Sequence, residues 1–112
     1  MKIYHNPRCS KSRQALAILE ENGVNVEIIE YLKDIPTAEE LSELIKKLNI
    51  SPEELVRKSE KDFKENFKGQ TLTDKQWVEA MIEFPKLIER PIVVKNNKAV
   101  LGRPPENVLS LL

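Results

Sequence analysis

The chain contains a single cysteine, Cys9, and it is the residue best suited to nucleophilic chemistry. It follows a turn after a predicted strand (residues 2–4) and precedes a predicted amphipathic helix (residues 10–22). The first N–H groups of a helix lack intrahelical partners, and with the positive end of the helix dipole they stabilise an anion. Cys9 is therefore predicted to ionise near neutral pH, although a lone cysteine is more often a small buried hydrophobic residue.

Basic side chains lie close to this cysteine in the sequence. Arg8, Lys11 and Arg13 are all within four residues of it, and a protonated His5 would add a further positive charge. Nearby positive charge favours the thiolate over the thiol. A histidine in a turn can equally serve as a local hydrogen-bonding group, and Asn6 is expected to bond amides of the same turn.

Two arginines near the end of the chain are predicted to face each other. The pair Asn96-Asn97 suits the two-residue loop of a type I′ hairpin, and counting outward from this loop pairs Arg90 with Arg103. Like charges directly opposed in a sheet are destabilising, unless an anion lies between them. Guanidinium groups bind planar oxyanions through two hydrogen bonds, so the pair indicates an oxyanion site. Two surface arginines paired with nearby glutamates are the alternative.

The order of the predicted elements indicates an α/β fold with one mixed four-stranded sheet. A β-α-β unit opens the chain, helices fill the middle, and a β-β-α unit closes it. One domain is expected over residues 1–112, with a helical insertion at about 37–88 between strands two and three. After the first helix, the predicted elements are a strand at 24–31, helices at 38–48, 52–58 and 74–84, strands at 92–95 and 98–101, and a helix at 104–111.

The composition narrows the class of protein. The 112 residues include 18 basic and 18 acidic side chains, so the formal net charge is zero. This balance argues against a protein that binds nucleic acid or an anionic membrane. A lone cysteine requires no oxidising compartment, and no apolar run approaches the length of a membrane span. We expect a cytoplasmic monomer with no bound metal or cofactor.

Three stretches carry a resemblance to a known family: residues 3–13 (IYHNPRCSKSR), 89–94 (ERPIVV) and 102–106 (GRPPE). In this order they resemble the glutaredoxin-coupled arsenate reductase (ArsC) family. The resemblance covers essentially the whole chain. It implies a thioredoxin-like fold with a helical insertion, and reduction of arsenate to arsenite.

The resemblance also implies a reaction and a set of site residues. The Cys9 thiolate would attack arsenic, glutathione as co-substrate would attack the resulting thioester, and glutaredoxin would reduce the mixed disulfide before arsenite leaves. The implied site residues are Arg57, Arg90 and Arg103 for the oxyanion, His5 for lowering the Cys9 pKa, and Pro91 as a cis-proline beside the site.

Ser12 stands where a second cysteine would complete a C-x-x-C pair, so the motif cannot form an internal disulfide and an outside thiol must finish a redox cycle. Spx-like regulators, which bind RNA polymerase, share the fold but often carry C-x-x-C. A glutathione-linked monothiol oxidoreductase is the other alternative. The stretch 8–13 is more basic than the loop of the best-established arsenate reductases, which leaves a related oxyanion open as substrate.

Overall fold

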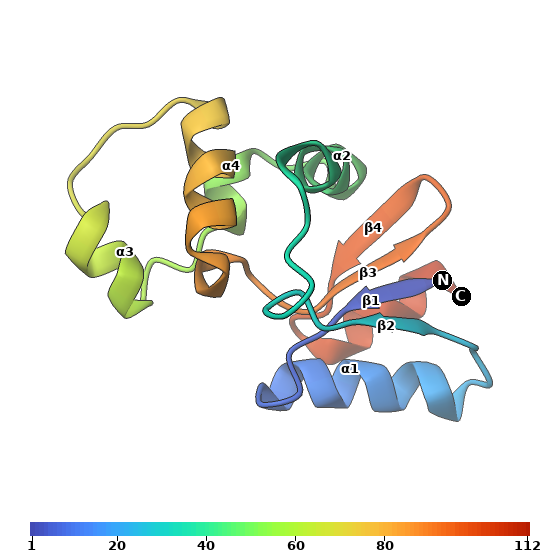
Figure 1. Ribbon diagram of the computed structural model, residues 1–112. Coiled ribbons are helices and arrows are strands. Elements are labelled where there is room, and N and C mark those ends of the chain that lie inside the picture. Colours follow the sequence, from blue (N-terminus) through green and yellow to red (C-terminus); the bar gives the residue numbers. More distant parts are fainter. The chain divides into compact units, whose positions relative to one another are not determined.

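The computed structural model describes all of residues 1–112, and the chain packs as two compact units (Figure 1). Unit 1 comprises Met1–Asp34 and Arg90–Leu112, and unit 2 comprises Ile35–Glu89. No helix is both long enough and apolar enough to cross a membrane.

Unit 1 is built on a mixed four-stranded sheet, as predicted. Its strands are β1 (Lys2–Tyr4), β2 (Glu27–Ile29), β3 (Ile92–Lys95) and β4 (Lys98–Leu101), in the order β2-β1-β3-β4. The central strand β1 pairs in parallel with β2 and antiparallel with β3. A strand from the start of the chain, β1, therefore lies beside a strand of the late hairpin, β3. The loop that follows β1 is attached to the same sheet as that hairpin.

The second strand is shorter than the predicted 24–31, because backbone groups at both ends are engaged elsewhere. The Val24 N–H donates to the carbonyl of Leu19 at the end of the preceding helix, 3.0 Å away. Beyond β2, the N–H groups of Lys33 and Asp34 both donate to the Glu30 carbonyl in a turn. Only three residues are left to pair with β1.

The hairpin of β3 and β4 has the predicted register. Ile92 pairs with Leu101 and Lys95 pairs with Lys98, which leaves Asn96-Asn97 as the connecting loop. The predicted turn type is wrong, because a type I′ turn needs positive φ at both central residues and only Asn96 has it, with φ of 55°. Positive φ at the first position alone is the pattern of a type II′ turn, which gives the same register.

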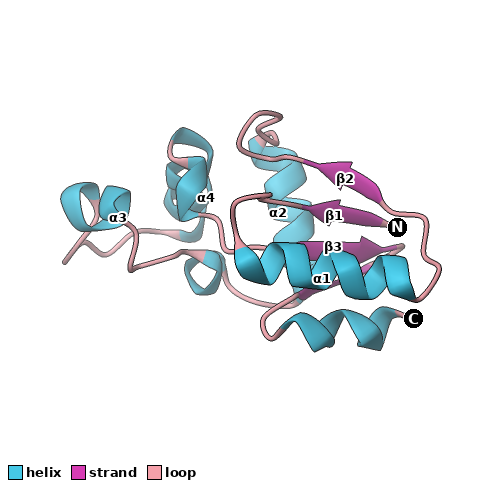
Figure 2. Ribbon diagram, turned by 90° about the horizontal axis from the view of Figure 1, so that it is seen from below, coloured by secondary structure: helices cyan, strands magenta, loops and turns pink.

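The core of unit 1 lies between the sheet and two helices. Helix α1 (Ser10–Glu21) and the final 3₁₀ helix η3 (Pro105–Leu111) run side by side, as Figure 2 shows. The C-terminal helix was predicted in the right place, but its turns are of the tighter 3₁₀ type. The buried cluster at the centre consists of Ile3, Ala15, Leu19, Val93, Val108 and Leu111.

Unit 2 is helical. Its elements are α2 (Ala38–Leu48), the 3₁₀ helix η1 (Pro52–Leu55), α3 (Lys61–Asn66), α4 (Asp74–Glu83) and the 3₁₀ helix η2 (Pro85–Leu87). Capping boxes begin both long helices, as Thr37 and Glu40 at α2 predicted. The helix predicted at 52–58 ends early, because Val56 turns to extended backbone and forms a β-bridge with Ile88.

The segment left unassigned from the sequence holds the short helix α3. It packs on α4 through aromatic rings: Phe63 stacks on Trp77 with ring centroids 6.2 Å apart, and Phe67 meets Phe84 edge-on at 5.7 Å. Such pairs contribute beyond their buried area. The polar residues of 59–70 hid this element, since none of the residues of α3 is buried.

Candidate active site

The turn that carries Cys9 extends directly from the central strand. The N–H of His5 continues the parallel ladder by donating to the carbonyl of Ile29, 2.8 Å away. Cys9 then stands at the N-cap of α1, where its N–H donates to the Asn6 carbonyl at 2.9 Å and its carbonyl accepts from the Arg13 N–H at 3.0 Å. The predicted position of Cys9 at the start of a helix is confirmed.

A buried hydrogen-bond network centred on Ser12 fixes this turn. The Ser12 hydroxyl is 2.6 Å from Nδ1 of His5, and it accepts from the N–H of Asn6 at 3.1 Å. The Asn6 side-chain oxygen in turn accepts from the N–H of Arg8 at 3.0 Å, the local amide bonding predicted for Asn6. All three side chains at the centre, His5, Asn6 and Ser12, are buried. Because buried polar groups need partners, the network gives the turn one defined shape.

The Cys9 thiol lies close to a positively charged arginine at the base of the late hairpin. Nη1 of Arg103 is 3.8 Å from the Cys9 sulfur and 3.1 Å from the carbonyl oxygen of Arg90, to which it donates. The hairpin register therefore brings the two arginines together, as predicted. Both side chains are only partly exposed, and both belong to unit 1 together with the thiol.

These surroundings lower the pKa of Cys9 from 9.0 to about 7. Burial alone would raise that pKa, but three groups outweigh it: the Ser12 backbone N–H, the side chain of Arg90 through a hydrogen bond and its charge, and the Arg103 side chain. The Ser12 N–H acts on the thiolate even though the sulfur does not stand in the geometry of a regular cap hydrogen bond. The thiolate of Cys9 is therefore available near neutral pH.

His5 does not supply the positive charge that a protonated histidine would give. Burial lowers the pKa of His5 below its ordinary value of 6.5 and outweighs the opposing charge of Glu30, while the weaker influence of Arg13 lowers the pKa and that of Glu20 raises it. The imidazole is therefore neutral at neutral pH. What the structure shows for His5 is its hydrogen bond to Ser12, and an effect on the pKa of Cys9 stays a prediction.

Close packing around Gly102 holds Arg103 in place. A Cβ atom at Gly102 would lie 2.7 Å from Cγ of Pro91 and 3.1 Å from Cβ of Ala15, so only glycine fits between the hairpin and α1. The Gly102 N–H donates to the Pro91 carbonyl at 2.9 Å. The peptide bond before Pro91 is cis, as the family resemblance implies, and so is the bond before Pro104.

Arg57, the third predicted oxyanion ligand, belongs to unit 2. Its Nη1 lies 2.6 Å from Oε1 of Glu89, and its Nε lies 4.0 Å from Oε2 of Glu60. Its backbone is tied down as well, since the Arg57 N–H donates to the Leu87 carbonyl at 2.7 Å. A part in binding the oxyanion stays a prediction for Arg57.

Two features of the site were missed at the level of sequence: the tight packing at Gly102 and the cis bond before Pro104. The helix N–H that acts on the thiolate is that of Ser12, three positions after the N-cap, where the N–H normally meets the capping side chain. The packing at Gly102 has no local signal in the sequence.

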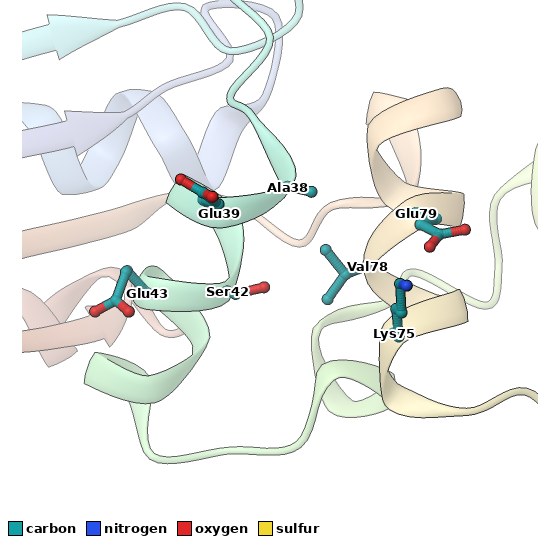
Figure 3. A pocket seen from close by; sticks show the side chains of 7 residues that line it. All are labelled: Ala38, Glu39, Ser42, Glu43, Lys75, Val78 and Glu79. Atoms are coloured by element: carbon teal, nitrogen blue, oxygen red, sulfur yellow. The ribbon is translucent and has the colours of Figure 1, made fainter.

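A separate cavity of about 430 Å³ lies in unit 2 between α2 and α4 (Figure 3). Val78 and Ser42 face it from the two helices, and its lining also includes three carboxylates and one ammonium group. This excess of negative charge disfavours an oxyanion, and no predicted site residue lines the cavity. No group of three or more His, Cys, Asp or Glu side chains is arranged to hold a metal ion. Its lining residues are Ala38, Glu39, Ser42, Glu43, Lys75, Val78 and Glu79.

Known proteins resemble the chain over its whole length. The family model described as "ArsC family" matches residues 4–111. The chain is 49% identical over 114 residues to the uncharacterised protein YfgD of Escherichia coli K12, covering 100% of this chain and 96% of that protein. It is 41% identical to an arsenate reductase of Neisseria meningitidis, covering 100% and 97% of the two chains. The solved structure of arsenate reductase from Vibrio cholerae superposes with a TM-score of 0.94 at 47% identity, covering 100% and 98%.

These likenesses agree with the mixed sheet, the helical insertion and the thiol beside two arginines. They extend through both units and include solved structures at nearly half identity, so they reach well beyond a shared architecture. The fold is thioredoxin-like, and the chain belongs to the ArsC family.

Proposed function

We propose that this protein reduces arsenate to arsenite, with Cys9 as the nucleophile and glutathione and glutaredoxin as the source of electrons. The observation that carries the proposal is the Cys9 thiol with a pKa of about 7, 3.8 Å from a guanidinium nitrogen of Arg103. A thiolate available at neutral pH and a cationic site for an oxyanion are the two requirements of this chemistry. The relatives named arsenate reductase support the choice of arsenate.

In the first step the Cys9 thiolate attacks arsenic. One arsenate oxygen takes up protons and leaves as water, so an S–As bond replaces an O–As bond and arsenic remains As(V). Arsenate is itself an anion and repels the thiolate. Arg90 and Arg103, and the predicted ligand Arg57, would offset this repulsion and hold the oxygens during attack.

In the second step a glutathione thiolate attacks the sulfur of the Cys9 adduct. An S–S bond forms, the S–As bond breaks, and its electron pair stays on arsenic, which becomes As(III) in arsenite. Glutaredoxin then reduces the mixed disulfide and returns the Cys9 thiolate before arsenite leaves the site. Two thiols thus supply two electrons, as a chain with one cysteine and a serine at position 12 requires.

Ser12 and His5 would act by positioning the thiol. Ser12 links the turn to His5 through hydrogen bonds, and its backbone N–H stabilises the thiolate. We also propose that the protein works as a monomer in the cytoplasm, where reduced glutathione keeps thiols available.

The test is turnover of arsenate by the purified protein. The native chain is incubated with arsenate, glutathione and glutaredoxin, and arsenite is measured by chromatography. We expect arsenite from the native protein, none above background from Cys9→Ser, and a strong loss of rate when glutaredoxin is omitted. Arsenite formation by Cys9→Ser at the native rate would contradict the proposal. If the native protein itself forms no arsenite, arsenate is excluded as its substrate.

A further inference from the structure

Helix α1 carries its charges in the order that opposes its own dipole. It has no acidic residue in its first turn and no basic residue in its last. Instead Lys11 and Arg13 lie near its N-terminus, and Glu20 and Glu21 lie at its C-terminus. Each of these placements is unfavourable to the helix, because cations are disfavoured at the positive end of the dipole and anions at the negative end.

Helix α2 shows that this order is not general in the chain. It begins with Glu39 and Glu40 and ends with Lys46 and Lys47, which is the favourable arrangement. The two helices have nearly the same length, so the reversal in α1 costs stability that α2 does not lose. A local rule broken at the start of α1, beside the reactive thiol, indicates a functional cause.

The exposed basic residues at this helix start are free of carboxylate partners. Arg8, Lys11 and Arg13 are exposed, and none of them forms an ion pair with a carboxylate. Arg13 donates from Nη1 to the Pro7 carbonyl at 2.9 Å, which holds its guanidinium against the turn. Two residues of extended chain span at most about 7 Å between Cα atoms, so the backbone positions of Arg8 and Lys11 lie within about one Debye length of that of Cys9.

These residues form a layer distinct from the pair that meets the thiol. Arg90 and Arg103 are partly buried and act directly on Cys9, which suits the oxyanion. The outer residues are exposed, so an anion that arrives after the oxyanion would meet them first. The second reactant of the proposed reaction is such an anion, because a glutathione-like thiol carries carboxylates.

We infer that Arg8, Lys11 and Arg13 form an outer basic rim that captures the carboxylates of an anionic peptide thiol as its sulfur approaches the Cys9 adduct. The inference rests on the proposed function, and it assigns the selection of the reductant to these three side chains. A cation about 8 Å from an anion in water changes the rate of encounter between the protein and the anion by about twofold for each unit charge. Several charges acting together therefore change it about tenfold at low salt.

The test measures the second half of the reaction without arsenic. Methyl methanethiosulfonate converts Cys9 to a methyl mixed disulfide, and a thiolate then attacks it, forming a new S–S bond and releasing the Cys9 thiolate. Mass spectrometry follows the reaction with glutathione, with uncharged 2-mercaptoethanol and with cationic cysteamine. In the double variant Arg8→Glu/Lys11→Glu we expect reduction by glutathione about tenfold slower, reduction by 2-mercaptoethanol unchanged within twofold, and reduction by cysteamine faster.

The matched control is Lys95→Glu/Lys98→Glu. It makes the same change in net charge at the hairpin tip, where β3 pairs with the opposite end of β1 from the Cys9 turn. We expect this variant to reduce at the native rate with all three thiols, and 0.5 M NaCl to remove most of the difference for the rim variant. An equal loss with glutathione and 2-mercaptoethanol, or no loss with glutathione, would overturn the inference. Because arsenate is absent, the result is independent of whether the native protein turns over arsenate.

Discussion

The two units of this protein use charge for different purposes. Unit 1 contains nine basic and six acidic side chains, whereas unit 2 contains nine basic and twelve acidic ones. In unit 2 the charges serve the helices, through capping boxes, acidic first turns and lysines in the last turn of α2. In unit 1 five basic residues gather around Cys9, two of them against a helix dipole. The zero net charge of the whole chain is therefore the sum of a positive unit 1, whose basic residues gather around Cys9, and a negative unit 2.

The difference extends to how each unit satisfies its polar groups. The hydrogen bonds that cap the helices of unit 2 are exposed to solvent, so losing one costs little. The bonds that shape the Cys9 turn are buried, and losing one leaves a group with no water to replace its partner. Substitutions of the same kind should thus cost more in unit 1 than in unit 2.

The largest effect is expected from Gly102→Ala. The added methyl group would overlap Cγ of Pro91, and overpacking of this kind costs about 3 kcal/mol of unfolding free energy. The comparison is Gly69→Ala in unit 2, where no atom lies within 4 Å and only the left-handed backbone, with φ of 80°, costs about 1 kcal/mol. Urea denaturation measures both, and equal losses would contradict the difference in packing.

Ser12→Ala should come next, at about 2 kcal/mol, because it leaves the Asn6 N–H and the His5 ring without their buried partner. Thr37→Ala, which removes an exposed cap of α2, should cost about 1 kcal/mol in the same assay. The pKa of Cys9 should change little in Ser12→Ala, since the backbone N–H at position 12 is retained. A large rise in that pKa would show that the hydroxyl acts on the thiol.

Arg103→Ala should raise the pKa of Cys9 above its native value of about 7, because it removes a hydrogen bond that favours the thiolate. The thiolate fraction at pH 7 would fall accordingly. The rate of alkylation by iodoacetamide, followed against pH, reports this shift. Lys98→Ala, at the far end of the hairpin, is the control and should leave the pH midpoint of alkylation unchanged. If Arg103→Ala had the same midpoint as the native protein, Arg103 would not be a residue that lowers the pKa of Cys9.

Glu89→Gln should have the smallest effect, a loss of less than about 1 kcal/mol in unfolding free energy. The Arg57–Glu89 ion pair is short, but both side chains retain some exposure, and solvent screens such pairs. Thermal unfolding at low and high salt measures the contribution, which should shrink at high salt. A loss above 2 kcal/mol would mean that the pair behaves as a buried one.

Local signals made part of this structure predictable. The β1–turn–α1 segment follows from apolar periodicity and turn residues that lie close together in the sequence. The register of the hairpin followed from its two-asparagine loop alone, and with it the meeting of Arg90 and Arg103. Family resemblance, rather than any pattern, pointed to the cis bond before Pro91.

The remaining features depend on tertiary surroundings. His5 is neutral because other parts of unit 1 bury it, and no neighbouring residue in the sequence reveals that burial. The hydrogen bond from Val24 to Leu19 and the turn at Glu30 shorten β2 in ways that strand propensity does not register. Helix α3 escaped prediction because none of its residues is buried, so it shows no apolar periodicity.

Because the insertion separates β1 from β3, the first residues of unit 1 leave the ribosome long before its last. Cys9 emerges early, while Arg90 and Arg103, which lower its pKa, arrive only with the final quarter of the chain. Until the hairpin docks on β1, the sulfur lacks both guanidiniums and behaves as an ordinary thiol. The Cys9 sulfur therefore reaches its full nucleophilicity only after the chain has been completed and the hairpin has folded onto β1.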